Sequence, residues 1–132
     1  MAVGVLLVTH RGIGAELLAS AERILGRLPL PAAAIGMRSD DDCGATAAAI
    51  AARLAELDQG DGVLVLTDLF GATPSNLVRQ AVDAYPCAIV TGLNLPMLVK
   101  VFNYPDLDLP SLAEKALEGG HQGVRRVSDL EF

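Results

Sequence analysis

Two polar residues stand where apolar segments of this sequence end. The run from Val3 to Thr9 stops at His10, and the run from Val63 to Thr67 stops at Asp68. In an open parallel α/β sheet, ligands and reacting groups gather at the carboxyl ends of the strands. A histidine and an aspartate that meet there can hold, move or receive a charged group. The chemistry of this chain is therefore expected at His10 and Asp68.

The segment after Asp68 is suited to binding an anion. Thr73 and Pro74 are typical of a helix start, because Thr is a good N-cap and Pro is favoured at the first helical position. The backbone N–H groups of a first helical turn bind anions, and Gly71 lets the backbone approach a ligand closely. Thr73 and Ser75 add two hydroxyl groups. With the imidazole and the carboxylate, this set suits a phosphoryl group carried on the imidazole, without a metal or a cofactor.

The expected chemistry assigns a separate role to each member of the pair. Asp68 holds the N–H of one ring nitrogen of His10, which leaves the other nitrogen free to attack. Phosphoryl transfer then depends mainly on positioning and charge stabilisation. The alternative is structural, since a histidine at a strand end is often a surface residue and an aspartate there is often a cap or turn residue.

Other kinds of site fit the sequence less well. A receiver-type phosphoaspartate site needs an acidic pair after the first strand, where Thr9-His10-Arg11 stands. A Ser-His-Asp hydrolase needs a Gly-x-Ser-x-Gly turn, and the sequence contains none. Neither a Gly-x-Gly-x-x-Gly motif nor a P-loop is present. The second histidine, His121, lies in a glycine-rich segment and is interpreted as incidental.

Strand and helix patterns alternate along the chain. Apolar runs predict strands at 3–9, 32–37, 63–67 and 87–91, and helical spacing of apolar residues predicts helices at 14–28, 43–57, 74–84, 95–102 and 110–118. The buried face of the first helix is expected to include Ile24, and the acidic run at 40–42 is expected to favour the start of the second helix. The pair Gly119-Gly120 is expected to end the last helix. Residues 124–127 are expected to form one more short strand.

This alternation predicts an α/β fold with an open, mainly parallel sheet in the flavodoxin-like order 2-1-3-4 and helices on both faces. In that order the first and third strands are neighbours, about 4.8 Å apart. His10 and Asp68 can then touch, although they are far apart in the sequence.

Composition sets broader limits. The chain has 132 residues, of which 52% are hydrophobic and 20% charged, which predicts one folded domain spanning 1–132. Its net charge of −6 argues against nucleic acid or an anionic membrane as partners. The start has no signal-peptide pattern and no apolar stretch reaches the ~20 residues needed to span a bilayer, so a cytoplasmic location is expected. Cys43 and Cys87 have no metal-binding spacing.

Three motifs resemble one known family. They are Thr9-His10-x-Gly12, the segment Asp68-Leu69-Phe70-Gly71-Ala72-Thr73-Pro74-Ser75-Asn76, and the segment Gly92-Leu93-Asn94-Leu95-Pro96-Met97-Leu98. In order and spacing they are similar to the enzyme IIA domains of the mannose family in the bacterial phosphoenolpyruvate-dependent sugar phosphotransferase system. The likeness covers nearly the whole chain. A related IIA-like domain serves dihydroxyacetone kinases, but residues 94–98 look closer to the sugar branch.

The resemblance implies a phosphoryl carrier. His10 would accept a phosphoryl group from the histidine phosphocarrier protein and pass it to an enzyme IIB, with Asp68 as the partner of His10. Thr73 would stand at the family's hydroxyl position. The phosphoryl-binding residues expected from the motifs are Thr9, Gly71, Thr73 and Ser75. The resemblance also implies a homodimer in which a C-terminal strand crosses to the other subunit's sheet, and contact with the membrane only through a permease complex.

The sequence departs from the family pattern in its extent. Many family members continue through a linker into a IIB domain, whereas this sequence stops at Phe132, so a single enzyme IIA-like domain without a fused IIB domain is expected. Two interpretations follow for the acceptor. A separate IIB chain receives the phosphoryl group, or the protein is a regulatory phosphoacceptor that signals through phosphorylation-dependent binding to another protein.

Overall fold

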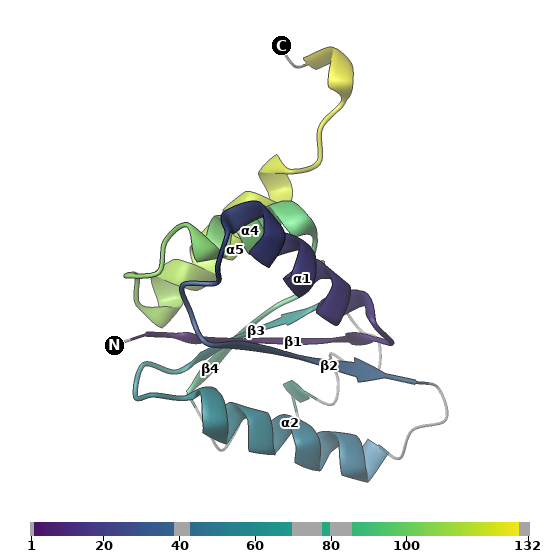
Figure 1. The fold of residues 1–132 in the computed structure, drawn as a ribbon, viewed down its shortest axis with the longest axis vertical. Coiled ribbons are helices and arrows are strands. Elements are labelled where there is room, and N and C mark those ends of the chain that lie inside the picture. Colours follow the sequence, from purple (N-terminus) through teal and green to yellow (C-terminus); the bar gives the residue numbers. More distant parts are fainter. Residues whose placement is uncertain (1, 39–42, 70–77, 80–85, 130–132) are drawn as a thin grey trace.

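A computed structural model describes residues 2–38, 43–69, 78–79 and 86–129. Its centre is a sheet of four parallel strands, β1 (Gly4–His10), β2 (Ala32–Met37), β3 (Val63–Thr67) and β4 (Cys87–Val90). The strand order is β2-β1-β3-β4 (Figure 1). This confirms the predicted α/β fold and the order 2-1-3-4.

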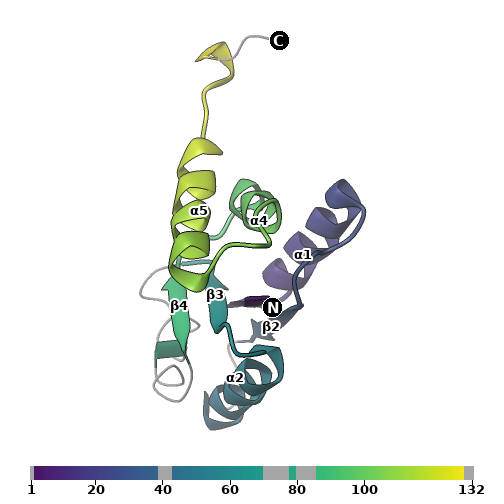
Figure 2. The same ribbon diagram turned by 90° about the vertical axis from the view of Figure 1, so that its left-hand side faces the viewer.

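Helices cover both faces of the sheet. Three of them, α1 (Ile13–Leu25), α4 (Leu95–Phe102) and α5 (Leu109–Gln122), lie on one face, and α2 (Cys43–Leu57) lies on the other (Figures 1 and 2). The predicted helix at 74–84 and the acidic run at 40–42 fall outside the described residues, except that residues 78 and 79 are helical.

The apolar runs of the strands are buried on both sides. Leu7 and Leu66 pack in a core beneath α1, α4 and α5, while Val8 and Val65 pack in a second core that includes Ile50 of α2. Successive side chains alternate between the faces of a strand, so a strand buried on both faces must be apolar at every position. This explains why the runs show no alternation of polar and apolar residues.

The pair Gly119-Gly120 does not end α5, contrary to the prediction, and the helix continues to Gln122. A Cβ at Gly119 would lie 2.5 Å from Cβ of Lys100 and 3.1 Å from the carbonyl oxygen of Pro96, both in α4. The glycines therefore permit close packing of α4 and α5, and this packing outweighs their low helix propensity. The observed start of α5 lies within one residue of the predicted start, with Asp108 accepting a hydrogen bond from the N–H of Ser111.

The end of α1 also differs from the prediction. The helix stops at Leu25 because Gly26 adopts a left-handed conformation, with a φ of 85°, and its N–H donates to the carbonyl of Glu22. The helix predicted to reach residue 28 therefore ends three residues earlier, at a glycine. Ile24 was expected to face inward, yet it is 59% exposed.

The C-terminal segment is not a strand in this structure. Residues 124–126 have no regular structure and Val127–Asp129 form a 3-10 turn. The segment projects away from the body of the molecule (Figures 1 and 2), and Val124 and Val127 are 79% and 67% exposed. The predicted strand at 124–127 is therefore wrong for the isolated chain, because none of the described strands lies beside it. In the part of the chain that the structure describes, no helix is long and apolar enough to span a membrane.

Candidate functional site

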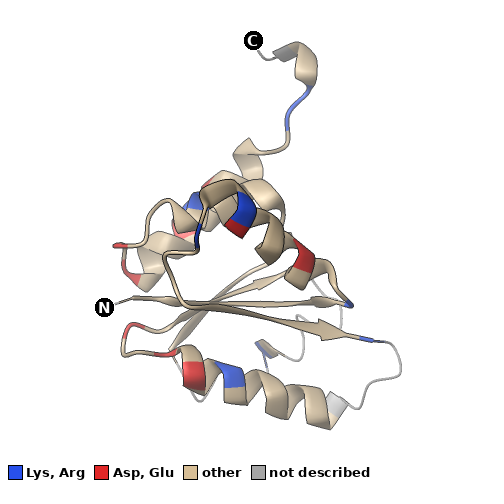
Figure 3. Ribbon diagram, in the orientation of Figure 1, with Lys and Arg blue, Asp and Glu red and all other residues tan. Residues whose placement is uncertain are grey.

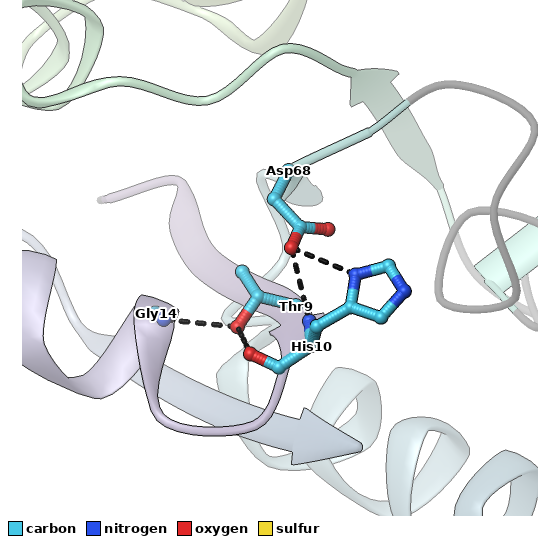
Figure 4. Close-up of polar contacts among 4 residues, drawn as sticks. All are labelled: Thr9, His10, Gly14 and Asp68. Carbon is cyan, nitrogen blue, oxygen red and sulfur yellow. Dashed lines mark hydrogen bonds and ion pairs between the residues drawn. The ribbon is translucent and has the colours of Figure 1, made fainter. Parts of the chain in front are cut away.

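His10 and Asp68 meet at the carboxyl edge of the sheet, as the strand order predicts (Figure 4). His10 is the last residue of β1, and Asp68 directly follows β3. Nδ1 of His10 lies 2.9 Å from Oδ2 of Asp68, and the backbone N–H of His10 donates to the same oxygen at 3.1 Å. Because β1 and β3 pair as far as Val8 and Thr67, residues 58 apart in the sequence come into contact.

The environment of Asp68 favours its charged form. Burial works to raise the pKa of this carboxyl, but hydrogen bonds from the side chain and backbone of His10 outweigh it, so the pKa is lowered from its usual 3.8. A carboxylate can only accept hydrogen bonds. Nδ1 of His10 is therefore the protonated nitrogen of the neutral ring, and Nε2 keeps its lone pair.

The two side chains of the pair differ in exposure. The His10 side chain is 46% exposed, whereas that of Asp68 is 12% exposed. Asp68 is thus mostly buried and supports the histidine, whereas part of the His10 ring is open to solvent. This arrangement allows a second molecule to reach Nε2 while Oδ2 holds the other side of the ring.

Thr9 supports the turn that follows His10. Its hydroxyl accepts a hydrogen bond from the N–H of Gly14 at 2.9 Å and donates to the carbonyl of His10 at 3.1 Å (Figure 4). The residue is fully buried. Of the residues expected to bind a phosphoryl group, Thr9 thus lies next to His10 with its hydroxyl engaged in fixing the start of α1.

The sequence analysis does not predict the unusual backbone conformation of the turn between β1 and α1. Arg11 has a φ of 42°, in the left-handed region that non-glycine residues rarely adopt. Its N–H donates to the carbonyl of Met37 at 2.6 Å, at the end of β2. Gly36 leaves room for the carbonyl of Arg11, since a Cβ there would overlap it. The signal in the sequence was a glycine near the end of an otherwise apolar strand.

Two buried oxygens at this edge have no hydrogen-bond partner among the described residues. They are Oδ1 of Asp68 and Oγ1 of Thr67, the latter in a fully buried residue. Buried polar atoms without a partner are uncommon and often lie at functional sites. The other expected phosphoryl-binding residues, Gly71, Thr73 and Ser75, lie outside the described residues.

Comparison with known proteins places this geometry in a family. The model of the EIIA-man family, described as the PTS system fructose IIA component, matches residues 4–116. The mannose-specific EIIAB component of the phosphotransferase system from Escherichia coli K12 is 31% identical over 130 residues. That alignment covers 96% of this chain and 40% of the relative, so the chain spans about two fifths of the length of the curated relatives it matches.

Solved structures agree with the family match. The mannose/sorbose-specific IIA subunit from Enterococcus faecalis superposes with a TM-score of 0.87 at 34% identity, covering 100% of this chain and 99% of that one. A PTS IIA protein associated with the fucose utilization operon of Streptococcus pneumoniae shares the fold, with a TM-score of 0.82 at 24% identity over 98% of each chain. The chain belongs to the mannose family of enzyme IIA domains of the bacterial sugar phosphotransferase system.

Proposed function

We propose that His10 carries a phosphoryl group on Nε2, received from the histidine phosphocarrier protein and passed to an enzyme IIB. The observation that carries this proposal is the 2.9 Å contact between Nδ1 of His10 and Oδ2 of Asp68 beside a half-exposed ring. It orients the imidazole, selects one tautomer and leaves the nucleophilic nitrogen accessible.

The transfer needs no redox partner and no metal. The lone pair of Nε2 attacks phosphorus, the bond between phosphorus and the donor's imidazole breaks, and that imidazole takes the bonding pair. The Nδ1 proton stays between His10 and Asp68, where the carboxylate stabilises the positive charge that develops on the ring. The second transfer runs the same exchange in reverse, with Nε2 as the leaving group.

The segment after Asp68 completes the proposal. Gly71, Thr73 and Ser75 supply backbone N–H and hydroxyl donors to the phosphoryl oxygens, on the strength of their residue types and their position in the sequence. Thr9 contributes by holding the turn, which its two hydrogen bonds support.

The test is phosphorylation of the two histidines of the chain. The protein is incubated with phosphoenolpyruvate, enzyme I and the phosphocarrier, and acid-labile phosphate is measured. We expect His10→Ala to abolish labelling. His121→Ala, which alters an exposed histidine at the end of α5, is the matched control and should label like the wild type. Full labelling of His10→Ala would overturn the proposal.

The acceptor is proposed to be an enzyme IIB, because curated relatives of this chain are named EIIAB components. A chase of the labelled protein with purified mannose-family IIB proteins should discharge His10. If His10 is labelled and no such IIB discharges it, the regulatory interpretation replaces transport, and the phosphorylated form should then bind a regulator differently from the unphosphorylated form.

A homodimer is proposed from the state of the C-terminal segment. Its valines at 124 and 127 are largely exposed and β4 lies at an edge of the sheet. An uncovered edge strand presents unpaired N–H and C=O groups. Pairing of this segment with β4 of a second copy would cover both the valines and the edge.

A further inference from the structure

Arg11 stands out because its backbone is strained and its side chain has no hydrogen-bond or ion-pair partner among the described residues. A residue other than glycine in the left-handed region costs roughly 1–2 kcal/mol, yet Arg11 has a φ of 42°. The glycine of this turn, Gly12, follows it and has an ordinary φ of −89°. The strained position therefore holds the arginine and the relaxed position holds the glycine. Strain of this kind gathers at functional sites.

The strain is imposed by contacts on both sides of Arg11. Its N–H donates to Met37, and its carbonyl lies against the Cα of Gly36. Since β2 fixes both contacts, the backbone at Arg11 cannot relax without disturbing the end of β1. The residue is thus held in a defined place, one position after His10.

The side chain of Arg11 is exposed, and its guanidinium makes no hydrogen bond or ion pair with the residues that the structure describes. Consecutive Cα atoms are about 3.8 Å apart, so an arginine side chain at this position is long enough to reach a group bound to the His10 ring. Figure 3 shows basic segments directly after β1 and β2, at the same edge as His10. The acidic residues Asp58 and Asp61 precede β3 and lie at the opposite edge.

A phosphoryl group at Nε2 would add negative charge close to Asp68, and the positive charge of Arg11 can offset it. Such a group carries about 1.5 to 2 negative charges near neutral pH. It would sit on a ring whose other nitrogen contacts the carboxylate of Asp68, in a protein with a net charge of −6. A guanidinium stays charged at all physiological pH values and offers a planar fork of donors that matches phosphoryl oxygens.

We propose that Arg11 is a phosphoryl-binding residue, held by the strained turn so that its guanidinium pairs with the phosphoryl group on His10. This proposal rests on the proposed function of His10. It predicts that Arg11 raises the rate at which His10 is phosphorylated and lengthens the half-life of the phosphohistidine. The reason is that the ion pair between the guanidinium and the phosphoryl group forms both in the transition state and in the phosphorylated product.

The experiment compares Arg11→Gln, Arg11→Lys and Arg27→Gln with the wild type. Arg27 is also exposed and lies after α1, at the opposite edge of the sheet, so its variant has the same change in net charge. Each protein is phosphorylated once from the phosphocarrier and once from phosphoramidate, a small donor that makes no protein interface. The rate of labelling and the half-life of the phosphohistidine are measured at low and high salt.

We expect Arg11→Gln to lower both quantities about tenfold at low salt, which is the size of effect that the loss of one hydrogen bond between charged groups produces. Arg11→Lys keeps the charge but not the planar fork, so it should recover only part of the loss. The difference between Arg11→Gln and the wild type should shrink at high salt because exposed charges are screened. Arg27→Gln should match the wild type. The small donor must show the same ranking, since the effect lies in the site and not in docking.

Two results overturn different statements. If Arg11→Gln and Arg27→Gln label and decay alike while His10→Ala is not labelled, Arg11 does not bind the phosphoryl group and the role of His10 stands. If the wild type is not labelled on His10 from either donor, the proposed function itself fails. A loss seen only with the phosphocarrier assigns Arg11 to the interface and overturns phosphoryl binding.

Discussion

Two of the close contacts that glycines permit in this molecule have different consequences. At the turn after β1, Gly36 lies against the carbonyl of Arg11. Between α4 and α5, Gly119 lies against Lys100. The first contact holds a strained residue beside a half-exposed histidine, and the second joins two helices on one face of the sheet.

The two regions also differ in how their polar groups are satisfied. Around the helix contact, Asn94 accepts a hydrogen bond from Met97 and donates to the carbonyl of Gly120, and Lys100 pairs with Glu118. At the carboxyl edge of the sheet, Thr67 and Asp68 each keep a buried oxygen without a partner among the described residues. The polar groups at the helix contact are thus paired and stabilise the fold. The carboxyl edge of the sheet, where a ligand is expected, contains a strained backbone and buried oxygens without a partner among the described residues.

The largest effect is expected at Gly36. A Cβ there overlaps the carbonyl oxygen of Arg11, which is backbone and cannot rotate away, so the ends of β1 and β2 must separate. We expect Gly36→Ala to lower the free energy of unfolding by about 3 kcal/mol and to reduce labelling of His10 even where the protein is folded. Urea denaturation and the labelling assay measure the two effects.

The matched control for Gly36 is Gly12, in the turn that Gly36 contacts. A Cβ added at Gly12 would have nothing within 4 Å, and the φ of this residue is ordinary, so Gly12→Ala should change stability by no more than about 0.5 kcal/mol. Equal stability of Gly36→Ala and Gly12→Ala would show that the turn is not clamped by β2.

A smaller effect is expected at Gly119. The new Cβ meets Lys100 and the carbonyl of Pro96, and this costs more than the gain in helix propensity, so Gly119→Ala should destabilise the protein by about 1–2 kcal/mol. Labelling of His10 should be unchanged in the folded protein. At Gly120 the nearest atom is the flexible end of Met97, and Gly120→Ala should cost less. The reverse ranking, by thermal or urea unfolding, would contradict the packing argument.

Asp68→Asn tests the edge without changing its shape. Hydrogen bonds to a charged acceptor exceed neutral ones by about 1 kcal/mol, so we expect a loss of that size at pH 7 and slower phosphoryl transfer. The pKa of Asp68 is lowered in the folded state, so its stabilising effect is present above 3.8 and is lost as the pH falls through the lowered value. The difference in stability between wild type and variant should therefore vanish in acid. A difference that persists there, or an unchanged transfer rate, would show that the carboxylate charge is not used.

The smallest effect on the fold is expected at the C-terminal segment. Val124 and Val127 are largely exposed, so replacing both with Ser should leave the unfolding of the isolated chain nearly unchanged. It should weaken the proposed dimer. Light scattering should give about twice the chain mass of 13.7 kDa for the wild type and a lower mass for the variant at the same micromolar concentration. A monomeric wild type would reject the dimer.

Most of the elements and the candidates for chemistry could be predicted from the sequence alone. The strands at 32–37 and 63–67 and the helix at 95–102 have their predicted bounds, because unbroken apolar runs and capped helical stripes are local signals. The alternation of these elements was enough to predict the order 2-1-3-4, and that order placed His10 beside Asp68.

The roles of the glycines, in contrast, depend on the tertiary structure. Gly119 and Gly120 carry the same local signal as a helix end, yet they lie inside α5 because Lys100 and Met97 of another helix pack against them. Gly36 and Arg11 acquire their roles from each other, across the pair of strands β1 and β2. The local sequence shows which conformations and contacts a glycine permits. Which of them it adopts depends on the distant residue that the fold packs against it.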